Sequence, residues 1–173
     1  MTEQTLPGAG ADPGAAAHVG DPLAEQRAMA RGAAVVDRSH RGVLTVTGPD
    51  RLSWLHLLLT QHVSDLPADT GTETLILDIN GRVLHHMVVG HTADTVFLDT
   101  EPDDVPELLG YLQKMVFWSQ VEPRDASAEL ALLSVVGPDT PEVLAAAGVA
   151  VPERPHGVLA LPDGGAVRRM DWP

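Results

Sequence analysis

Histidine is the residue type in this sequence with the widest chemical range: there are eight histidines, one tyrosine and no cysteine. Imidazole is a common metal ligand, so a metal site is the first hypothesis. The spacing argues against it. His56 and His62 lie on an expected helix and face different directions, and His85 and His91 share a strand face about 20 Å apart. His85 and His86 point to opposite faces of that strand, so no two neighbouring histidines can chelate a metal ion together. The simplest interpretation of His86 is a hydrogen-bonded core histidine.

Asp37, Ser39 and His40 have the residue types of a hydrolytic triad. They fall within four residues, too close in sequence to align a nucleophile, a base and an orienting acid. No Gly-x-Ser-x-Gly turn is present, so a serine hydrolase is disfavoured. Asp103 and Asp104 lie at an expected helix start, where negative charge stabilises the helix dipole.

Trp54, Phe117 and Trp118 make up half of the six aromatic residues of the chain. Two interpretations of the Phe117-Trp118 pair stay open: the rings close the core behind a helix, or they stack on a flat heteroaromatic ligand.

The composition narrows the class of protein. The 173 residues are 44% hydrophobic, and 24 acidic residues against 11 basic ones give a formal charge of -13. That charge disfavours general nucleic-acid binding and docking on a membrane. No signal peptide or membrane-length apolar run is seen, and cysteine is absent, which together predict a cytoplasmic protein. Residues 1–20, rich in Gly, Ala and Pro, are expected to form a disordered tail.

The strongest local signal is a hairpin joined by Asn80-Gly81, since this dipeptide suits a two-residue type I′ turn. Such a turn would pair Leu77 with Leu84, Ile76 with His85, and Leu75 with His86. Both strands are apolar on both faces, so both faces of the sheet are expected to be covered. The hairpin strands are expected at 72–79 and 82–91, other strands at 43–47, 95–99, 119–122 and 129–136, helices at 22–31, 50–61, 103–116 and 141–147, and a loop at 67–71.

The tripeptide Gly-Pro-Asp occurs twice after a strand and before a helix, at residues 48–50 and 137–139. This repeat indicates a duplicated module, although chance recurrence is an alternative because Gly-Pro-Asp commonly begins a helix. We predict a first module at 21–124 and a second, incomplete one at 125–173.

Several segments, in order, resemble the glycine-cleavage T-protein (aminomethyltransferase) family. They are Asp37-Arg-Ser39-His40-Arg-Gly42, Val46-Thr-Gly48-Pro-Asp50, Leu59-Thr-Gln61-His62-Val63, Asp78-Ile-Asn80-Gly81-Arg82-Val83 and Val121-Glu-Pro-Arg-Asp125. The Asn-Gly-Arg-Val tetrapeptide is similar to the YgfZ-type branch, whose folate-binding proteins assist iron–sulfur cluster assembly or repair.

The resemblance implies an α+β fold of two antiparallel-sheet modules around a cavity for tetrahydrofolate. It implies that His85 and His86 replace an acidic pair of T-proteins, which makes them the candidate catalytic residues and puts aminomethyl transfer in doubt. It also implies a set of folate-contacting residues: His40, Gln61, His62, His85, His86, Asp99 and Trp118.

Three functions follow from the resemblance. The first is a folate-binding accessory protein for iron–sulfur clients, the second a folate-dependent one-carbon transferase, and the third an inactive truncated fragment. The Lys-Gly-Cys-Tyr-x-Gly-Gln-Glu motif of the YgfZ-type branch is not found in the sequence.

Overall fold

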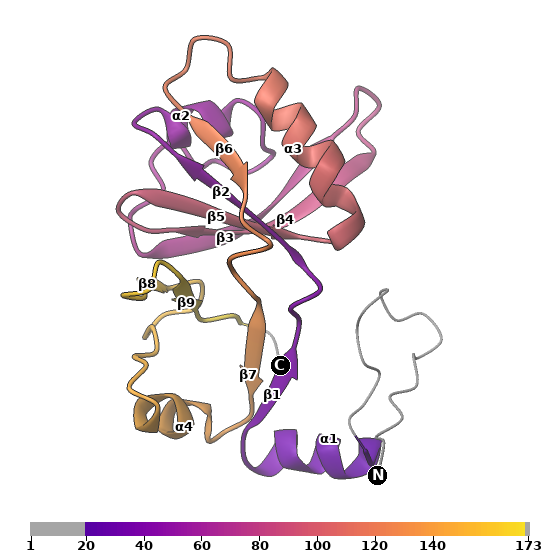
Figure 1. Ribbon diagram of the computed structural model, residues 1–173, viewed down its shortest axis with the longest axis vertical. Helices are drawn as coiled ribbons and strands as arrows, with labels where there is room; N and C mark the ends of the chain where they lie inside the picture. Colours follow the sequence, from indigo (N-terminus) through magenta and orange to yellow (C-terminus); the bar gives the residue numbers. More distant parts are fainter. Residues whose placement is uncertain (1–19, 172–173) are drawn as a thin grey trace. The chain divides into compact units, whose positions relative to one another are not determined.

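A computed structural model describes residues 20–171 (Figure 1). The predicted disordered tail therefore lies outside the described residues, apart from Gly20. The described chain forms two compact units, residues 20–40 with 131–150, and residues 41–130 with 151–171. The predicted module boundary at 124/125 stays a prediction.

The first unit pairs two short strands and carries two helices. Helix α1 (Pro22–Arg31) has the predicted bounds: it begins where the Asp21 carboxylate accepts a hydrogen bond from the Leu23 N–H at 3.0 Å, and Gly32 follows its last residue. Strand β1 (Ala34–Asp37) pairs antiparallel with β7 (Leu133–Val136), and α4 (Thr140–Ala146) follows β7. The strand predicted over 129–136 is thus only its last four residues.

The second unit is built on a five-stranded antiparallel sheet in the order β3-β4-β5-β2-β6. A small hairpin near the C-terminus was not predicted. The predicted α+β class with antiparallel sheets is confirmed. The strands are β2 (Gly42–Thr47), β3 (Thr70–Leu77), β4 (Val83–His91), β5 (Thr95–Thr100), β6 (Glu122–Asp125), β8 (Val158–Ala160) and β9 (Ala166–Arg168), and the helices are α2 (Arg51–His56), the 3₁₀ turn η1 (Pro102–Asp104) and α3 (Val105–Lys114).

The helices α2 and α3 lie on one side of this sheet and the β8–β9 hairpin on the other (Figure 1). The helix-covered face holds the hydrophobic core of the unit, because alternate residues of each strand point to the same face. The core combines Leu44, Val46, Met87, Val96 and Leu98 from the strands with Trp54, Leu55, Leu108 and Leu112 from the helices, all buried.

The tip of the β3–β4 hairpin differs from the prediction. The Gly81 N–H donates to Asp78 O at 3.0 Å and Gly81 has a φ of 79°, so the loop has three residues and the two-residue turn is wrong. The Asp78 carboxylate accepts the backbone N–H groups of Asn80 and Arg82 at 2.7 and 2.9 Å, which favours this wider loop.

A bulge after the tip restores the register. Leu77 pairs with Val83, which makes the predicted Leu77–Leu84 pair wrong. Leu84 is the extra residue of the bulge, so the predicted pairs Ile76–His85 and Leu75–His86 are confirmed.

The sheet is not covered on both faces along its whole length, which contradicts the prediction. Near the hairpin tip, Leu77, Val83 and Leu84 are 39%, 57% and 48% exposed. The β8–β9 hairpin joins the other end of β3, where Gly157 bridges to Thr70. It therefore leaves the tip uncovered.

Helix α2 ends at His56, five residues before its predicted end. The Thr60 N–H donates to Leu75 O at 3.0 Å, so the chain leaves the helix to satisfy the edge of β3. As a result the rings of His56 and His62 lie 4.3 Å apart, and the prediction that they face different directions is wrong. Other bounds shift as well: β3 begins at Thr70 in the predicted loop, and β6 begins at Glu122, where the predicted strand ends.

The two Gly-Pro-Asp turns share one backbone geometry. Gly48 and Gly137 have φ values of 106° and 126°, and an added Cβ would meet a carbonyl oxygen at 2.1 and 2.2 Å respectively. The repeated strand–turn–helix is confirmed as a local motif, and duplication remains its interpretation.

Candidate functional site

The sheet face away from the helices is the candidate functional site, and we call it the open face. In an antiparallel sheet, directly paired residues point to the same side. The pairs Thr45–Phe97 and Thr47–Thr95 therefore share this face with Asp99, which pairs with Val43 and Val88. Polar side chains on the neighbouring strands β2 and β5 contrast with the apolar core behind them.

A buried ion cluster lies at Asp99. The Arg168 guanidinium donates from Nη2 to Asp99 Oδ1 at 2.6 Å, and Arg41 Nε lies 3.4 Å from Asp99 Oδ2. Arg41 also pairs with the Glu101 carboxylate. Asp99 and Arg41 are only 5% and 6% exposed, so these charges are mostly removed from water and depend on each other.

One donor in this cluster is unused. The Arg41 Nε–H is buried and has no hydrogen-bond partner within residues 20–171, because its contact with Asp99 has the distance of an ion pair without hydrogen-bond geometry. Buried donors normally have a hydrogen-bond partner, so this N–H is available to donate to an acceptor atom of a ligand or of water.

An imidazole–carboxylate pair lies on the same face. His86 Nε2 lies 3.1 Å from the Glu73 carboxylate, and both side chains are about half exposed. Such a pair can accept or donate a proton at the surface of the sheet.

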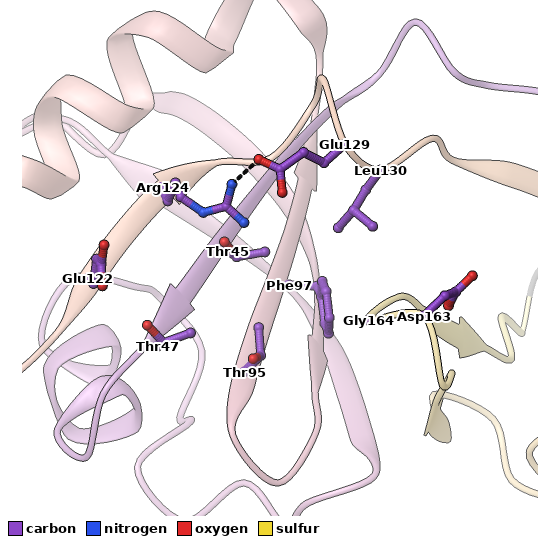
Figure 2. A pocket seen from close by; sticks show the side chains of 10 residues that line it. All are labelled: Thr45, Thr47, Thr95, Phe97, Glu122, Arg124, Glu129, Leu130, Asp163 and Gly164. Atoms are coloured by element: carbon purple, nitrogen blue, oxygen red, sulfur yellow. Dashed lines mark hydrogen bonds and ion pairs between the residues drawn. The ribbon is translucent and has the colours of Figure 1, made fainter.

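The open face also carries a pocket of about 310 Å³ (Figure 2). Figure 2 shows its floor on β2 and β5 and one wall at the turn between β8 and β9. Arg124 in the lining donates to the Glu129 carboxylate, and this hydrogen bond raises the pKa of Arg124 above its usual value, helped by the charges of Glu129, Glu122 and Asp125. The pocket is lined by Thr45, Thr47, Thr95, Phe97, Glu122, Arg124, Glu129, Leu130, Asp163 and Gly164.

The structure separates the two candidate catalytic histidines. His85 lies on the helix-covered face, 4% exposed, with Nδ1 3.5 Å from the Asp104 carboxylate. That Nδ1 has no hydrogen-bond partner in the described chain. His86 instead reaches the open face. The simple interpretation of His86 as a core histidine is therefore wrong, and a buried histidine is found next to it.

Among the predicted folate contacts, His86 and Asp99 share the open face. Gln61 and His62 are exposed, and His62 Nε2 lies 3.0 Å from the Asp65 carboxylate. His40 belongs to the first unit. The assignment of these residues to a folate site stays a prediction.

The Phe117-Trp118 pair does not close the core. Phe117 is 72% exposed and Trp118 is 93% exposed, whereas Trp54 is buried in the core and donates to Met115 O at 2.8 Å. The core-packing interpretation of the pair is therefore wrong, and ligand stacking stays open.

Sequence reasoning missed several open-face residues, namely Arg41, Glu73, Thr45 and Arg168. The alternation Val43-Leu-Thr45-Val-Thr47 was a usable signal for the threonines, because a period of two places both on one face. No sequence signal pointed to Arg168, since it lies 69 residues from its partner Asp99 along the chain.

In the described part of the chain, no three histidine or acidic side chains come close enough together to hold a metal ion. The same residues include no helix that is long and apolar enough to cross a membrane.

Comparison with known proteins gives the family. Residues 18–153 match the GCVT N-terminal domain, so the chain belongs to that family of T-protein-like domains. It is 32% identical over 133 residues to the aminomethyltransferase of Methylococcus capsulatus, covering 73% of this chain and 35% of that protein. It is 30% identical over 128 residues to the aminomethyltransferase of Parafrankia sp., again covering 73% and 35%.

The fold agrees with this assignment. The glycine cleavage system aminomethyltransferase T from Bartonella henselae superposes with a TM-score of 0.71 and 21% identity, covering 80% of this chain and 38% of that one. The chain thus spans about a third of the length of the curated relatives it matches.

Proposed function

We propose that this protein binds tetrahydrofolate or a derivative through the open face of its five-stranded sheet. The proposal rests on one observation: one face is sealed by helices, while the other presents the Asp99 ion cluster beside a pocket. Membership in a family whose relatives are named aminomethyltransferases supports folate as the ligand.

The residues present fit such a ligand. The buried Arg41 Nε–H has no partner among the described residues and offers a hydrogen bond to an acceptor atom. Arg168 and Arg41 hold the Asp99 carboxylate in one orientation, so it can receive an N–H group of the ligand without moving. Tetrahydrofolate itself would supply the one-carbon chemistry, and these side chains would bind and orient it.

Our first candidate role is that of a YgfZ-type accessory protein for iron–sulfur proteins. It rests on the Asn80-Gly81-Arg82-Val83 hairpin tip and on His85-His86 at the position of the T-protein acidic pair. A neutral imidazole stabilises a developing cation less well than a carboxylate does, which favours orienting folate over transferring a group from it.

A second candidate role is folate-dependent one-carbon transfer. The His86–Glu73 pair favours it, since a carboxylate 3.1 Å from the imidazole restores an acidic group to the open face.

Calorimetric titration with tetrahydrofolate under reducing conditions tests the binding. We expect heat of binding for the wild-type chain and about tenfold weaker affinity for Asp99→Asn, because the reoriented amide cannot match both arginines. Glu107→Gln, on an exposed position of α3, is the control and should bind normally. No heat at high micromolar ligand would overturn the proposal.

Two further assays separate the roles. Turnover with an aminomethyl donor that is lost in His86→Ala but kept in His56→Ala would support the transferase. Restoration of iron–sulfur enzyme activity in a strain lacking the gene, by wild type and not by Asp99→Asn, would support the accessory role.

A further inference from the structure

We propose that two copies of this chain pair with each other through the outer edge of strand β7 in the first unit. The interface is a merged sheet in the order β1-β7-β7-β1, with a two-fold axis between the two copies of β7. This inference goes beyond ligand binding, because it concerns residues 20–40 and 131–150, none of which belongs to the five-stranded sheet.

The first unit has no core of its own. None of its described residues is buried, and neither α1 nor α4 buries a side chain. Its sheet consists of β1 and β7 alone (Figure 1). A two-stranded sheet without a packed apolar face is at best marginally stable in water. We therefore expect further protein surface to add to this sheet.

One side of the two-stranded sheet is apolar and exposed. Val35 pairs with Val135, and Leu133 lies two residues before Val135, so these three side chains point to the same side. Val35 is 63% exposed and Leu133 is 57% exposed. Neighbouring apolar side chains that face water are typical of a surface that a partner covers.

Strand β7 offers the edge at which a further strand can pair. Strand β1 ends at Asp37 and is followed by Arg38, and charges at a strand edge disfavour pairing with another chain. Strand β7, Leu-Ser-Val-Val, has neither a charge nor a proline. Within the described residues its backbone hydrogen bonds go to β1 alone, so the N–H and C=O groups of its outer edge remain available.

The sequence of β7 suits pairing with itself. When two copies run antiparallel and are centred on Ser134, Leu133 of each copy lies opposite Val135 of the other. Directly opposed residues point to the same side of a sheet, so the apolar faces of the two copies join into one. A two-fold axis produces both contacts at once, as in most homodimers.

The charge distribution favours a second copy as the partner. The first unit contains five acidic residues and three basic ones, Arg27, Arg31 and Arg38, so its formal charge is -2. The whole chain carries -13. Two copies that meet through this unit therefore avoid most of the repulsion between two strongly acidic chains.

Sedimentation of the full chain over a range of concentrations tests the pairing. We expect a species of twice 18.3 kDa to form as the concentration rises. Ser134→Lys places two ammonium groups opposite each other at the axis and should weaken dimerisation at least about tenfold. Leu23→Lys changes an exposed apolar residue of the same unit outside the β7 edge, and it should leave the dimer unchanged. Circular dichroism checks that both variants are folded.

A cross-link tests the register. The chain has no cysteine, so Ser134→Cys introduces a single thiol at the axis. Opposed residues of antiparallel strands have Cα atoms about 4.5–5.5 Å apart, which is within reach of a disulfide. Mild oxidation should give a covalent dimer in Ser134→Cys. Ser64→Cys, at an exposed position of the other unit, should give none.

Three results would overturn the inference. The first is a wild-type chain that stays monomeric at high micromolar concentration. The second is a dimer that persists unchanged in Ser134→Lys or fails to cross-link in Ser134→Cys, since its interface would lie elsewhere. The third is growth into larger assemblies, because a closed two-fold pair uses the β7 edge only once.

Discussion

The two faces of the five-stranded sheet are made by the same strands and have opposite properties. The helix-covered face is closed by fully buried residues such as Leu44 and Leu98, and its stability comes from apolar surface removed from water. The open face carries threonines, an ion cluster and a pocket, and its largest interactions are between charges. Alternation along each strand thus separates the part that holds the fold from the part that can meet a ligand.

The adjacent residues His85 and His86 show this difference within one strand. His85 is enclosed beside Asp104, and His86 is 44% exposed beside Glu73. The same side-chain type is thus a structural group at His85 and an available proton carrier at His86.

The largest expected effect would test whether the open face also stabilises the fold. Asp99→Ala leaves two largely buried guanidinium groups without their shared carboxylate, and we expect the free energy of unfolding to fall by about 3–5 kcal/mol. Urea unfolding followed by circular dichroism measures it. A loss below about 1 kcal/mol would mean that the cluster has no structural role.

A substitution that creates a cavity on the helix-covered face gives a loss of stability with which the effect of Asp99→Ala can be compared. Leu98→Ala should destabilise the protein by about 2–5 kcal/mol, because it removes a fully buried side chain from the core. The same unfolding measurement applies. Tetrahydrofolate affinity should be unchanged at a temperature where the variant is folded. A loss of affinity there would contradict the view that the covered face stabilises the fold and only the open face binds the ligand.

The turn that begins α2 links strand β2 to the cover of the core. Gly48→Ala should cost about 1–3 kcal/mol, since Gly48 has a φ of 106° and its new Cβ would meet Gln120 O at 2.1 Å. Gly110→Ala is a matched control within α3, where a Cβ meets nothing within 4 Å. Thermal melts should show this control to be more stable by about 0.5–1 kcal/mol.

His86→Ala should change stability by less than about 1 kcal/mol, because its pair with Glu73 is partly exposed to water. His85→Ala, at the buried neighbour, should cost more, about 1–3 kcal/mol. Equal losses in paired denaturant titrations would contradict the assignment of the two rings to different environments.

The smallest expected effect is the response of the β3–β4 hairpin loop to a fall in pH. Hydrogen bonds from backbone N–H groups, that of Arg82 foremost, hold the pKa of Asp78 below 3.8. A lowered folded pKa stabilises the turn above pH 3.8, and this contribution is lost as the pH falls below 3.8 through the folded value. The amide NMR shifts of Gly81 and Arg82 should therefore move below pH 4. Amide shifts that stay flat down to pH 2 would show that the carboxylate does not hold the loop.

Local signals predicted the elements well. The helix at 22–31, the strand that begins at Thr95 and the register of Ile76 with His85 were all predicted correctly, because each depends on residues close in sequence. Predictions failed where a distant group intervened. Thr60 leaves the helix to bond the edge of β3, and this brings His56 and His62 together.

The sequence by itself determined the antiparallel hairpin, the repeated Gly-Pro-Asp turn and the divergence of His85 from His86. These follow from backbone preferences and from the two-residue period of a strand. Only the tertiary structure decided which face is closed and what assembles on the other. Arg41, Asp99 and Arg168 are far apart in the chain, and their contact exists only because the folded sheet and the β8–β9 hairpin hold them together.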